Sequence, residues 1–389
     1  MIYNYNTIIS ERSDRGEVIT PPDLVEEMLN KLSKEVLESK ITTFLDPCFG
    51  TGTFLKAIGL LLKKFGHSPE NINNRLFGYE IDSRMINEAK AKMPYINISK
   101  KDFLKDEINM KFDVVIGNPP YQGNQSGGNK THSLWKKFIK KSISLTDLII
   151  FVTPSTWIGD DKVQRESFSK GFIEYAKLLP KETFKQGIDT SYWIFNKNQS
   201  SENSILELLD GTKIAFDNSK KDIPTSLINP LSISIHRKFL SANSIETMQS
   251  PIYYAYKNKT TIQKYPIYNT TAQGVCWSDK EPKDLKVSKI IFSNCGTYKA
   301  IYDNGTMGTC WHSHSFSINE KFSSNALEYM NLKAIRFFNM INRSGGFMNG
   351  VFANNLPHVD FSKSWTDREL YEHFNLTQEE IDYIEENVK

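Results

Sequence analysis

Apolar residues in the first half of the chain alternate between short continuous runs and stretches with helical spacing. The runs predict strands at 43–46, 75–81, 96–98, 112–117, 147–152 and 191–195. Helical spacing between them predicts helices at 23–32, 55–65, 83–92 and 134–143. Ser83 is the expected N-cap of the third helix. Such alternation predicts an α/β fold, with a mainly parallel sheet that carries helices on both faces and binds ligands at the carboxyl ends of its strands.

This alternation stops after residue 198. The remainder is rich in aromatic residues, Asn, Ser and Lys, with short strand-like pieces such as 289–292 and no strand–helix–strand unit. We therefore expect one domain at 1–198, an irregular α/β domain at 199–365 and an acidic helical segment at 366–389. In that segment Thr377 and Glu380 have the spacing of a capping box.

Composition narrows the class of protein. The chain has 389 residues, of which 39% are hydrophobic and 24% charged, as in folded globular proteins. Its longest apolar stretch, 148–152, is too short to span a bilayer, and the first residues lack a signal-peptide pattern. The four cysteines form no C-x-x-C pair, which favours a reducing, cytoplasmic location.

Charge is distributed unevenly. Residues 201–365 hold 18 Lys and Arg against 13 Asp and Glu, whereas 366–389 hold 2 against 8. The basic region can face a polyanion, although a solvated surface explains it equally well.

The loop after the first predicted strand is rich in glycine and reads Asp46-Pro47-Cys48-Phe49-Gly50-Thr51-Gly52-Thr53-Phe54. Gly50 and Gly52 let the backbone turn tightly and approach a ligand closely. Asp46 can pair with an ammonium group but would repel a phosphate.

Carboxylates also follow the next two predicted strands. Glu80 can accept hydrogen bonds from both hydroxyls of a ribose. Asp102 can accept from an adenine amino group, and Phe103 can cover the ring. Singly each has an ordinary structural explanation, but their order and strand-end placement favour a site for a nucleoside-like cofactor.

The segment Asn118-Pro119-Pro120-Tyr121 follows a buried strand directly. An aromatic amine is a weak nucleophile because its lone pair is delocalised into the ring. The side-chain oxygen of Asn118 and the carbonyl of Pro119 can each accept one amino hydrogen, which favours the pyramidal nitrogen. The prolines stiffen the turn, and Tyr121 can stack on the base. This arrangement suits transfer to an amino nitrogen by positioning, without a metal or a covalent intermediate.

In this order the motifs resemble the Rossmann-like class I amino-methyltransferases. They are most similar to the gamma-type adenine-specific (N6) DNA methyltransferases of restriction–modification systems, the Eco57I-like and TaqI-like enzymes. The resemblance covers residues 12–198 and implies a mostly parallel seven-stranded sheet, followed by a target-recognition domain. It implies that S-adenosylmethionine is bound by Thr20, Asp46, Pro47, Gly50, Gly52, Thr53, Phe54, Glu80, Ile81, Asp102, Phe103 and Asn118.

The same resemblance assigns the target base. A flipped-out adenine of double-stranded DNA would be held by Asn118, Pro119, Pro120 and Tyr121. A further aromatic from a late strand would pack on it, for which Phe195 is our choice and Trp193 the alternative; both can equally be core residues. The glycine-rich loop 122–130 is either a segment that orders on DNA or a plain connector. A cognate restriction endonuclease is the implied partner.

The second half carries weaker signals. Segments 292–300 and 304–309 resemble stretches of target-recognition regions. Lys257, Lys259 and Lys264 alternate with Tyr256 and Tyr265 and can contact phosphates, although solvated lysines are the simpler explanation. Two cysteine and histidine features, Cys310 and the pair His312 and His314, match no standard zinc spacing, so we expect no metal.

Two other substrates share this chemistry. Asn-Pro-Pro-Tyr also occurs in enzymes that methylate a glutamine of translation release factors, and an adenine in RNA is a further alternative. The long region after residue 195 favours DNA, because recognition of the sequence around a flipped base needs additional surface.

Overall fold

The computed structural model describes residues 19–93, 96–121, 134–159, 163, 166–184, 188–198, 204–217, 222–293, 295–344, 347–348 and 350–388. The chain divides into two compact units near residue 219, and residues 158–161 are grouped with the second. Within the described residues, no helix has the length and apolarity needed to cross a membrane.

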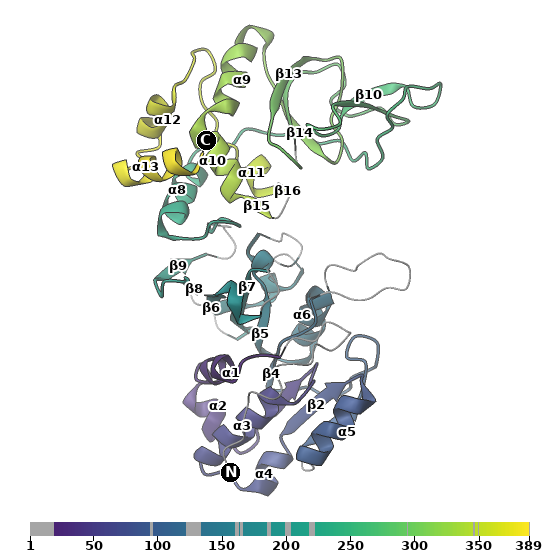
Figure 1. The fold of residues 1–389 in the computed structure, drawn as a ribbon, viewed down its shortest axis with the longest axis vertical. Coiled ribbons are helices and arrows are strands. Elements are labelled where there is room, and N and C mark those ends of the chain that lie inside the picture. The colour runs from purple at the N-terminus through teal and green to yellow at the C-terminus, as the bar shows by residue number, and fades with distance from the viewer. Residues whose placement is uncertain are drawn as a thin grey trace. The chain divides into compact units, whose positions relative to one another are not determined.

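The first unit is built around a nine-stranded sheet (Figure 1). Its strands are β1 Phe44–Asp46, β2 Leu76–Glu80, β3 Asn97–Lys100, β4 Val114–Gly117, β5 Leu148–Pro154, β6 Phe172–Leu179, β7 Thr190–Asn196, β8 Ser204–Glu207 and β9 Lys213–Phe216. Its helices are α1 Pro22–Leu29, α2 Lys34–Glu38, α3 Thr53–Lys64, α4 Pro69–Asn73, α5 Ser83–Lys92 and α6 Leu134–Leu145.

The strand order is β3-β2-β1-β4-β5-β7-β6-β8-β9. The strands from β3 to β5 are parallel, whereas β7 runs antiparallel to both of its neighbours, β5 and β6. The predicted α/β class is confirmed. The count of seven strands is wrong, because β8 pairs with β6 and β9 pairs with β8. These two strands follow residue 198, so the sheet continues past the predicted domain boundary.

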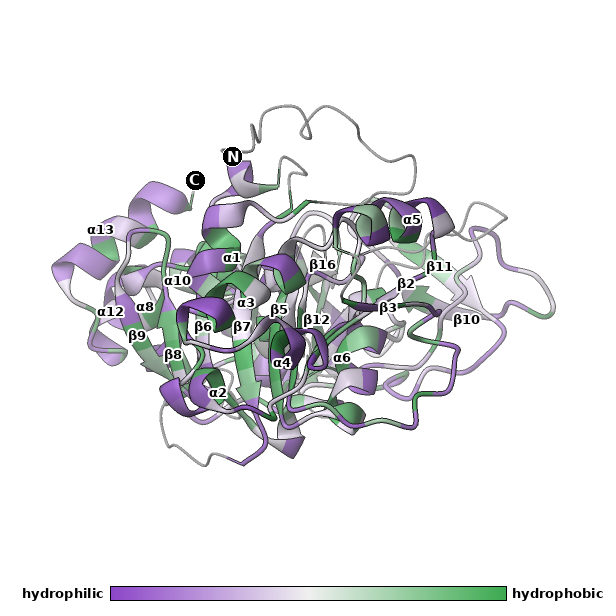
Figure 2. Cartoon of the chain, turned by 90° about the horizontal axis from the view of Figure 1, so that it is seen from below, coloured by the Kyte–Doolittle hydropathy of each residue, from purple (hydrophilic) through white to green (hydrophobic). Residues whose placement is uncertain are grey.

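Successive residues of a strand point to opposite faces of this sheet, and in β4 and β5 nearly all of them are buried. Val114, Ile116, Ile150 and Val152 pack in one hydrophobic cluster with residues of α1, α3 and α5. Figure 2 shows the hydrophobic colour concentrated on the strands, while hydrophilic residues cover much of the helices. The burial of both faces explains why β4 and β5 read as continuous apolar runs in the sequence.

The entry to α5 differs from the prediction. Asp82, not Ser83, is the N-cap residue, and its Oδ1 accepts a hydrogen bond from the backbone N–H of Arg84. Ser83 is the first residue of the helix. The cap lies two residues after the end of β2, so this connection is very short.

The second unit combines small antiparallel sheets with helices. Its strands are β10 Tyr265–Tyr268, β11 Val275–Ser278, β12 Ser288–Ser293, β13 Ala300–Asn304, β14 Ser313–Ser317, β15 Arg343–Ser344 and β16 Phe347–Met348. Its helices are α8 Pro230–Leu240, α9 Ser323–Asn331, α10 Lys333–Ile341, α11 Gly350–Asn354, α12 Asp367–His373 and α13 Gln378–Asn387. The predicted strand at 289–292 corresponds to β12, and the capping box of Thr377 and Glu380 begins α13.

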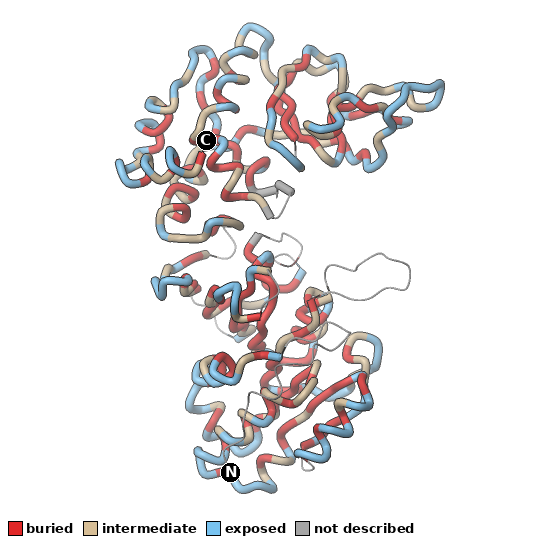
Figure 3. The backbone as a smooth tube through the Cα atoms, in the orientation of Figure 1, coloured by how far each residue is buried: buried red, intermediate tan, exposed pale blue. Residues whose placement is uncertain are grey.

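The acidic segment is part of the core of this unit. Leu370, Phe374 and Ile384 are buried in the same hydrophobic cluster as residues of α8, α9 and α10. Buried and exposed stretches alternate along the backbone of this unit (Figure 3). Residues 366–389 therefore pack as an integral layer of the second unit.

A buried ion pair joins β12 to β13 and supports the turn that follows β13. Lys289 and Asp303 are almost fully buried, and their Nζ and Oδ2 atoms are 2.7 Å apart. Burial would raise the pKa of Asp303, but hydrogen bonds from Lys289 and Thr306 hold it below its usual value. Asp303 also accepts backbone N–H groups of Gly305 and Met307, so the pair fixes the shape of this turn.

Candidate active site

The glycine-rich turn connects β1 to α3 at the carboxyl edge of the sheet. Gly50 and Gly52 have φ values of +51° and +80°, in the left-handed region that favours glycine. A Cβ on Gly52 would lie 2.4 Å from atoms of both Phe49 and Met93. The turn therefore requires glycine at this position for space as well as for backbone conformation.

Asp46 ends β1 and is buried within the turn. Its Oδ1 accepts the backbone N–H of Cys48 at 3.1 Å. On the adjacent strand, a Cβ on Gly117 would lie 2.9 Å from the same oxygen, so the end of β4 packs directly against this carboxylate. Burial raises the pKa of Asp46 to about 7, and the charge of Glu80 adds to the increase.

Glu80 ends β2 and joins the strand to the glycine turn. Its Oε2 accepts the backbone N–H of Gly50 at 2.9 Å, and its Oε1 accepts those of Ile81 and Asp82 at 2.7 and 2.9 Å. A carboxylate has about four acceptor positions, so three backbone bonds leave capacity for a ligand hydroxyl. Ile81, beside it, is 56% exposed and offers an apolar surface to a flat ring.

The structure brings Asn118 and Thr20 together from distant parts of the sequence. The Nδ2 of Asn118 donates to the Oγ1 of Thr20 at 3.2 Å. Thr20 is buried just before α1, and Asn118 follows the last residue of β4. Because the amide is planar, this bond directs its oxygen to the opposite side, away from Thr20.

Cys48 was not singled out in the sequence analysis, yet it lies between the two motifs. Burial and the charge of Asp46 raise its pKa well above the usual value, and the backbone N–H of Asn118 is directed at its thiol. Tyr121 is also buried, and burial and the neighbouring Cys48 raise its pKa. Within the described residues the Tyr121 hydroxyl has no hydrogen-bond partner. The sequence signal for Cys48 was its place within the glycine-rich turn 46–54.

Asp102 and Phe103 take ordinary structural roles in this structure. The Oδ1 of Asp102 accepts the backbone N–H groups of Leu104 and Lys105, and its Oδ2 pairs with the Lys105 ammonium at 3.3 Å. Phe103 is buried and stacks on Phe138 of α6, with ring centroids 5.1 Å apart. Phe54 is likewise in the core cluster.

Phe195 is not brought to the site. Because β7 is antiparallel to β5, its final residues lie at the edge opposite to the carboxyl ends of β1 and β4. Phe195 pairs with Ile149 near the start of β5, and its ring lies 5.8 Å from that of Phe168. Trp193 pairs with Phe151 and is fully buried. Both aromatic side chains are buried core residues, which was the alternative to a base-packing role in the sequence analysis.

The β6–β7 connection lies beside the carboxyl end of β5, because Thr190, the first residue of β7, pairs with Pro154. Phe184 lies in this connection and is buried in the same hydrophobic cluster as Phe54.

The buried carboxylate of Asp46 gives a prediction on stability. The folded pKa of about 7 exceeds the unfolded value of 3.8, so the folded state loses stability as the pH rises between these values. The cost above pH 7 amounts to roughly 4 kcal/mol. Asp46→Asn is therefore expected to stabilise the cofactor-free protein at pH 8 much more than at pH 5. Urea unfolding at the two pH values measures this, and a gain independent of pH would contradict it.

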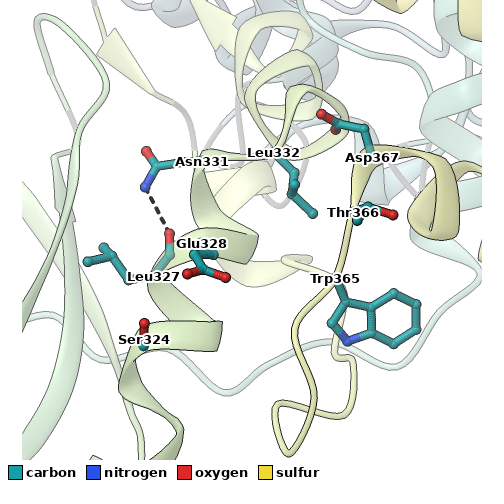
Figure 4. A pocket seen from close by; sticks show the side chains of 8 residues that line it. All are labelled: Ser324, Leu327, Glu328, Asn331, Leu332, Trp365, Thr366 and Asp367. Carbon is teal, nitrogen blue, oxygen red and sulfur yellow. Dashed lines mark hydrogen bonds between the residues drawn. The ribbon is translucent and has the colours of Figure 1, made fainter.

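The second unit contains a hollow whose lining includes carboxylates. About 660 Å³ in volume, it lies between α9 and the start of α12, and its lining includes Glu328, Trp365 and Asp367 (Figure 4). Burial and the charge of Glu385 raise the pKa of Asp367. Carboxylates on this wall disfavour an anionic ligand.

Two sequence expectations concern other regions. The loop 122–130 lies outside the described residues. Cys310 is buried, and its thiol is 3.4 Å from the carbonyl of Tyr268; His312 bonds through Nδ1 to Asn269. Over the part of the chain that the structure describes, no three His, Cys, Asp or Glu side chains are grouped as a metal would require.

The strand order with its reversed β7 places the first unit among the class I methyltransferase folds. Residues 34–195 match the family model described as Eco57I restriction-modification methylase. The resemblance inferred from the sequence motifs is thereby confirmed.

Named relatives agree with this family. An adenine-specific methylase of uncharacterised function from Mycoplasma pneumoniae is 27% identical over 199 residues, covering 45% of this chain and 47% of that protein. The type II methyltransferase M.VspI from Vibrio sp. is 32% identical over 128 residues, covering 31% and 29%. The aligned part thus spans half or less of these relatives.

Among solved structures, the methyltransferase subunit of a type I restriction-modification system from Streptococcus thermophilus is similar. It is 18% identical with a TM-score of 0.41, covering 53% of this chain and 50% of that one.

Proposed function

We propose that this protein transfers a methyl group from S-adenosylmethionine to the N6 amino group of a flipped-out adenine in double-stranded DNA. The observation that supports this most is the position of Asn118. It follows β4 beside the buried Asp46, and its amide is oriented by Thr20 at 3.2 Å. The relatives named as adenine-specific and type II methyltransferases favour DNA adenine over a protein glutamine or RNA.

The residues at the end of β1 and β2 fit S-adenosylmethionine. Gly50 and Gly52 hold the tight turn, as their φ values and the crowding at Gly52 require, and Gly50 adds no side chain where a ligand must approach. Asp46, when ionised, matches the ammonium of the methionine part, and Glu80 has acceptor capacity for the ribose. When bound, this cofactor supplies an electrophilic methyl group on a sulfonium.

The chain's own part in the reaction is positioning. We assign to the Oδ1 of Asn118 and the carbonyl of Pro119 the two amino hydrogens of the adenine, which localises the nitrogen lone pair. Pro120 holds this turn rigid. Tyr121 is the aromatic side chain proposed to contact the flipped ring, and Phe195, which pairs with Ile149 near the start of β5, is not part of this proposal. After transfer, the methylated nitrogen loses one proton to regain its planar form.

The second unit is the proposed target-recognition part, which would contact phosphates for position and base edges for sequence. A cognate restriction endonuclease is a proposed partner, and the cytoplasm, where bacterial DNA is accessible, is the proposed location.

Sequencing of single DNA molecules tests this function. DNA is taken from a methylation-deficient host that expresses the chain, with Asn118→Ala as the inactive control. Methylated adenine confined to one short motif, and absent with the variant, is the expected result. Unmodified DNA from a host with folded, cofactor-binding protein would overturn the proposal in favour of RNA or a protein glutamine.

A further inference from the structure

A small lobe around β10 and β11 projects from the β12–β14 sheet of the second unit (Figure 1). We define the β10–β11 lobe as residues 251–278 together with Cys310 and Trp311. Its own core is small and consists of Ile252, Ile267, Cys276 and Cys310. The backbone N–H of Trp311 donates to the carbonyl of Ile252 at 2.9 Å, which ties Trp311 to the lobe. A lobe with so few buried side chains has most of its residues at the surface.

Large aromatic side chains are exposed on this lobe. Tyr254 is 76% exposed, Tyr253 59% and Trp311 47%, and Tyr256 is exposed as well. In the described parts of the chain, every exposed tyrosine and tryptophan lies in this lobe. The rings of Tyr253 and Trp311 lie in contact at a tilt, with centroids 4.9 Å apart and planes 31° apart. Exposed aromatic clusters of this kind mark interaction surfaces rather than ordinary solvated surface.

The charges of the lobe all have one sign. Between Thr247 and Ser278 the sequence contains Lys257, Lys259 and Lys264 and no Asp or Glu. All three lysines are exposed, and among the described residues none forms an ion pair with a carboxylate. The Nζ atoms of Lys259 and Lys264 lie 5.1 Å from the ring centroids of Trp277 and Tyr265.

A second region of this unit is acidic, and exposed Asp279 and Glu281 also follow the lobe directly. Residues 366–389, which hold 8 Asp and Glu, form α12 and α13, and Glu328 and Asp367 line the hollow beside α12. A polyanion is repelled by that side and attracted to the lobe. Lysines interleaved with exposed aromatic rings fit one polyanion in particular, because nucleic acid offers both phosphates and flat bases.

We propose that the β10–β11 lobe docks on the duplex DNA substrate. Lys257, Lys259 and Lys264 contact phosphates, and Tyr254 with the Tyr253–Trp311 pair contacts exposed base surface in a groove or at a distorted step. This inference rests on the proposed function for its substrate. It adds the surface that holds the flanking DNA, which the Asn118 site by itself does not provide.

The salt dependence of DNA binding tests the lysines. Binding of a labelled duplex to the full chain is measured over a range of salt concentrations by fluorescence anisotropy. Lys257→Gln/Lys259→Gln is expected to reduce the slope of log affinity against log salt by about 1 per lysine. The matched control, Lys321→Gln/Lys363→Gln, removes the same charge from exposed positions outside the lobe and is expected to leave the slope unchanged. Equal slopes for both double variants would overturn the proposal.

A second measurement tests the aromatics. Tyr254→Ala is expected to weaken duplex binding about tenfold, and Tyr254→Phe, which keeps the ring, to restore most of the affinity. The side chain is exposed, so thermal unfolding of both variants should match that of the parent protein. Unchanged affinity in Tyr254→Ala, or preference of the lobe for an RNA hairpin over duplex DNA, would contradict the proposal.

These outcomes separate the lobe from the proposed function. Lobe-dependent DNA binding without methylation of any DNA would retain the lobe and remove the enzyme activity. Methylation that persists with normal salt dependence in the lysine variant would retain the activity and remove the lobe. Absence of duplex binding at low salt would overturn the lobe proposal directly.

Discussion

Replacement of Asn118 by alanine is expected to lower the rate of methyl transfer by at least about 10²-fold, since one of two acceptors for the developing charge is lost. The affinity for S-adenosylmethionine should remain measurable, because Asp46 and Glu80 are unchanged. A radiolabelled methyl-transfer assay on host DNA gives the rate, and isothermal titration gives the cofactor affinity.

Two further variants define the cause of this loss. Asn118→Asp keeps side-chain acceptor oxygens and is expected to retain more activity than Asn118→Ala. Thr20→Val removes the acceptor that orients the amide at 3.2 Å and should lower the rate by a smaller factor. Near-normal methylation by Asn118→Ala would refute the proposed mechanism.

Replacement of Glu80 by alanine is expected to weaken cofactor binding by about 10² or more. Each hydrogen bond to a charged group contributes about 1.5–3 kcal/mol, and the ribose offers two hydroxyls. The variant also leaves the N–H groups of Gly50, Ile81 and Asp82 without their acceptor, which loosens the turn. Isothermal titration with S-adenosylmethionine measures the loss.

The control is Glu88→Ala, which removes an exposed carboxylate of α5 and should leave the affinity unchanged. Glu80→Gln provides a second test, the pH dependence of cofactor affinity. The charge of Glu80 contributes to the raised pKa of Asp46, so the neutral variant should move the pH dependence of cofactor affinity to lower pH. Affinity unaffected by either Glu80 change would rule out its ribose role.

The motifs at strand ends were predictable from the sequence. Asp46, Glu80 and Asn118 each follow a buried apolar run, and a parallel sheet brings the carboxyl ends of such runs to one edge. The same reasoning failed for Phe195. Phe195 does lie in an apolar run that forms a strand. Which end of that strand reaches the site edge depends on whether β7 runs parallel or antiparallel to β5, and no local sequence pattern indicates this.

Other parts of the fold depend on contacts that a sequence pattern does not carry. The strands β8 and β9 have exposed or half-buried positions along their length and so lack a strong apolar run. The stacking of Phe103 on Phe138 joins residues from separate elements. Cys48 drew no attention because its contacts with Asp46 and Asn118 arise only when β1 and β4 lie side by side.

The position of β7 has a consequence for how the protein is made. This strand is synthesised after β6, yet it lies between β5 and β6 in the finished sheet. Until residue 196 has left the ribosome, β5 and β6 each have an edge with no partner, and open edges of this kind recruit other chains. Insertion of β7 therefore joins β5 to β6 only after both of these strands have been made. A nascent chain or expression fragment that stops before Thr190 would be expected to aggregate, even though every motif up to Tyr121 is present.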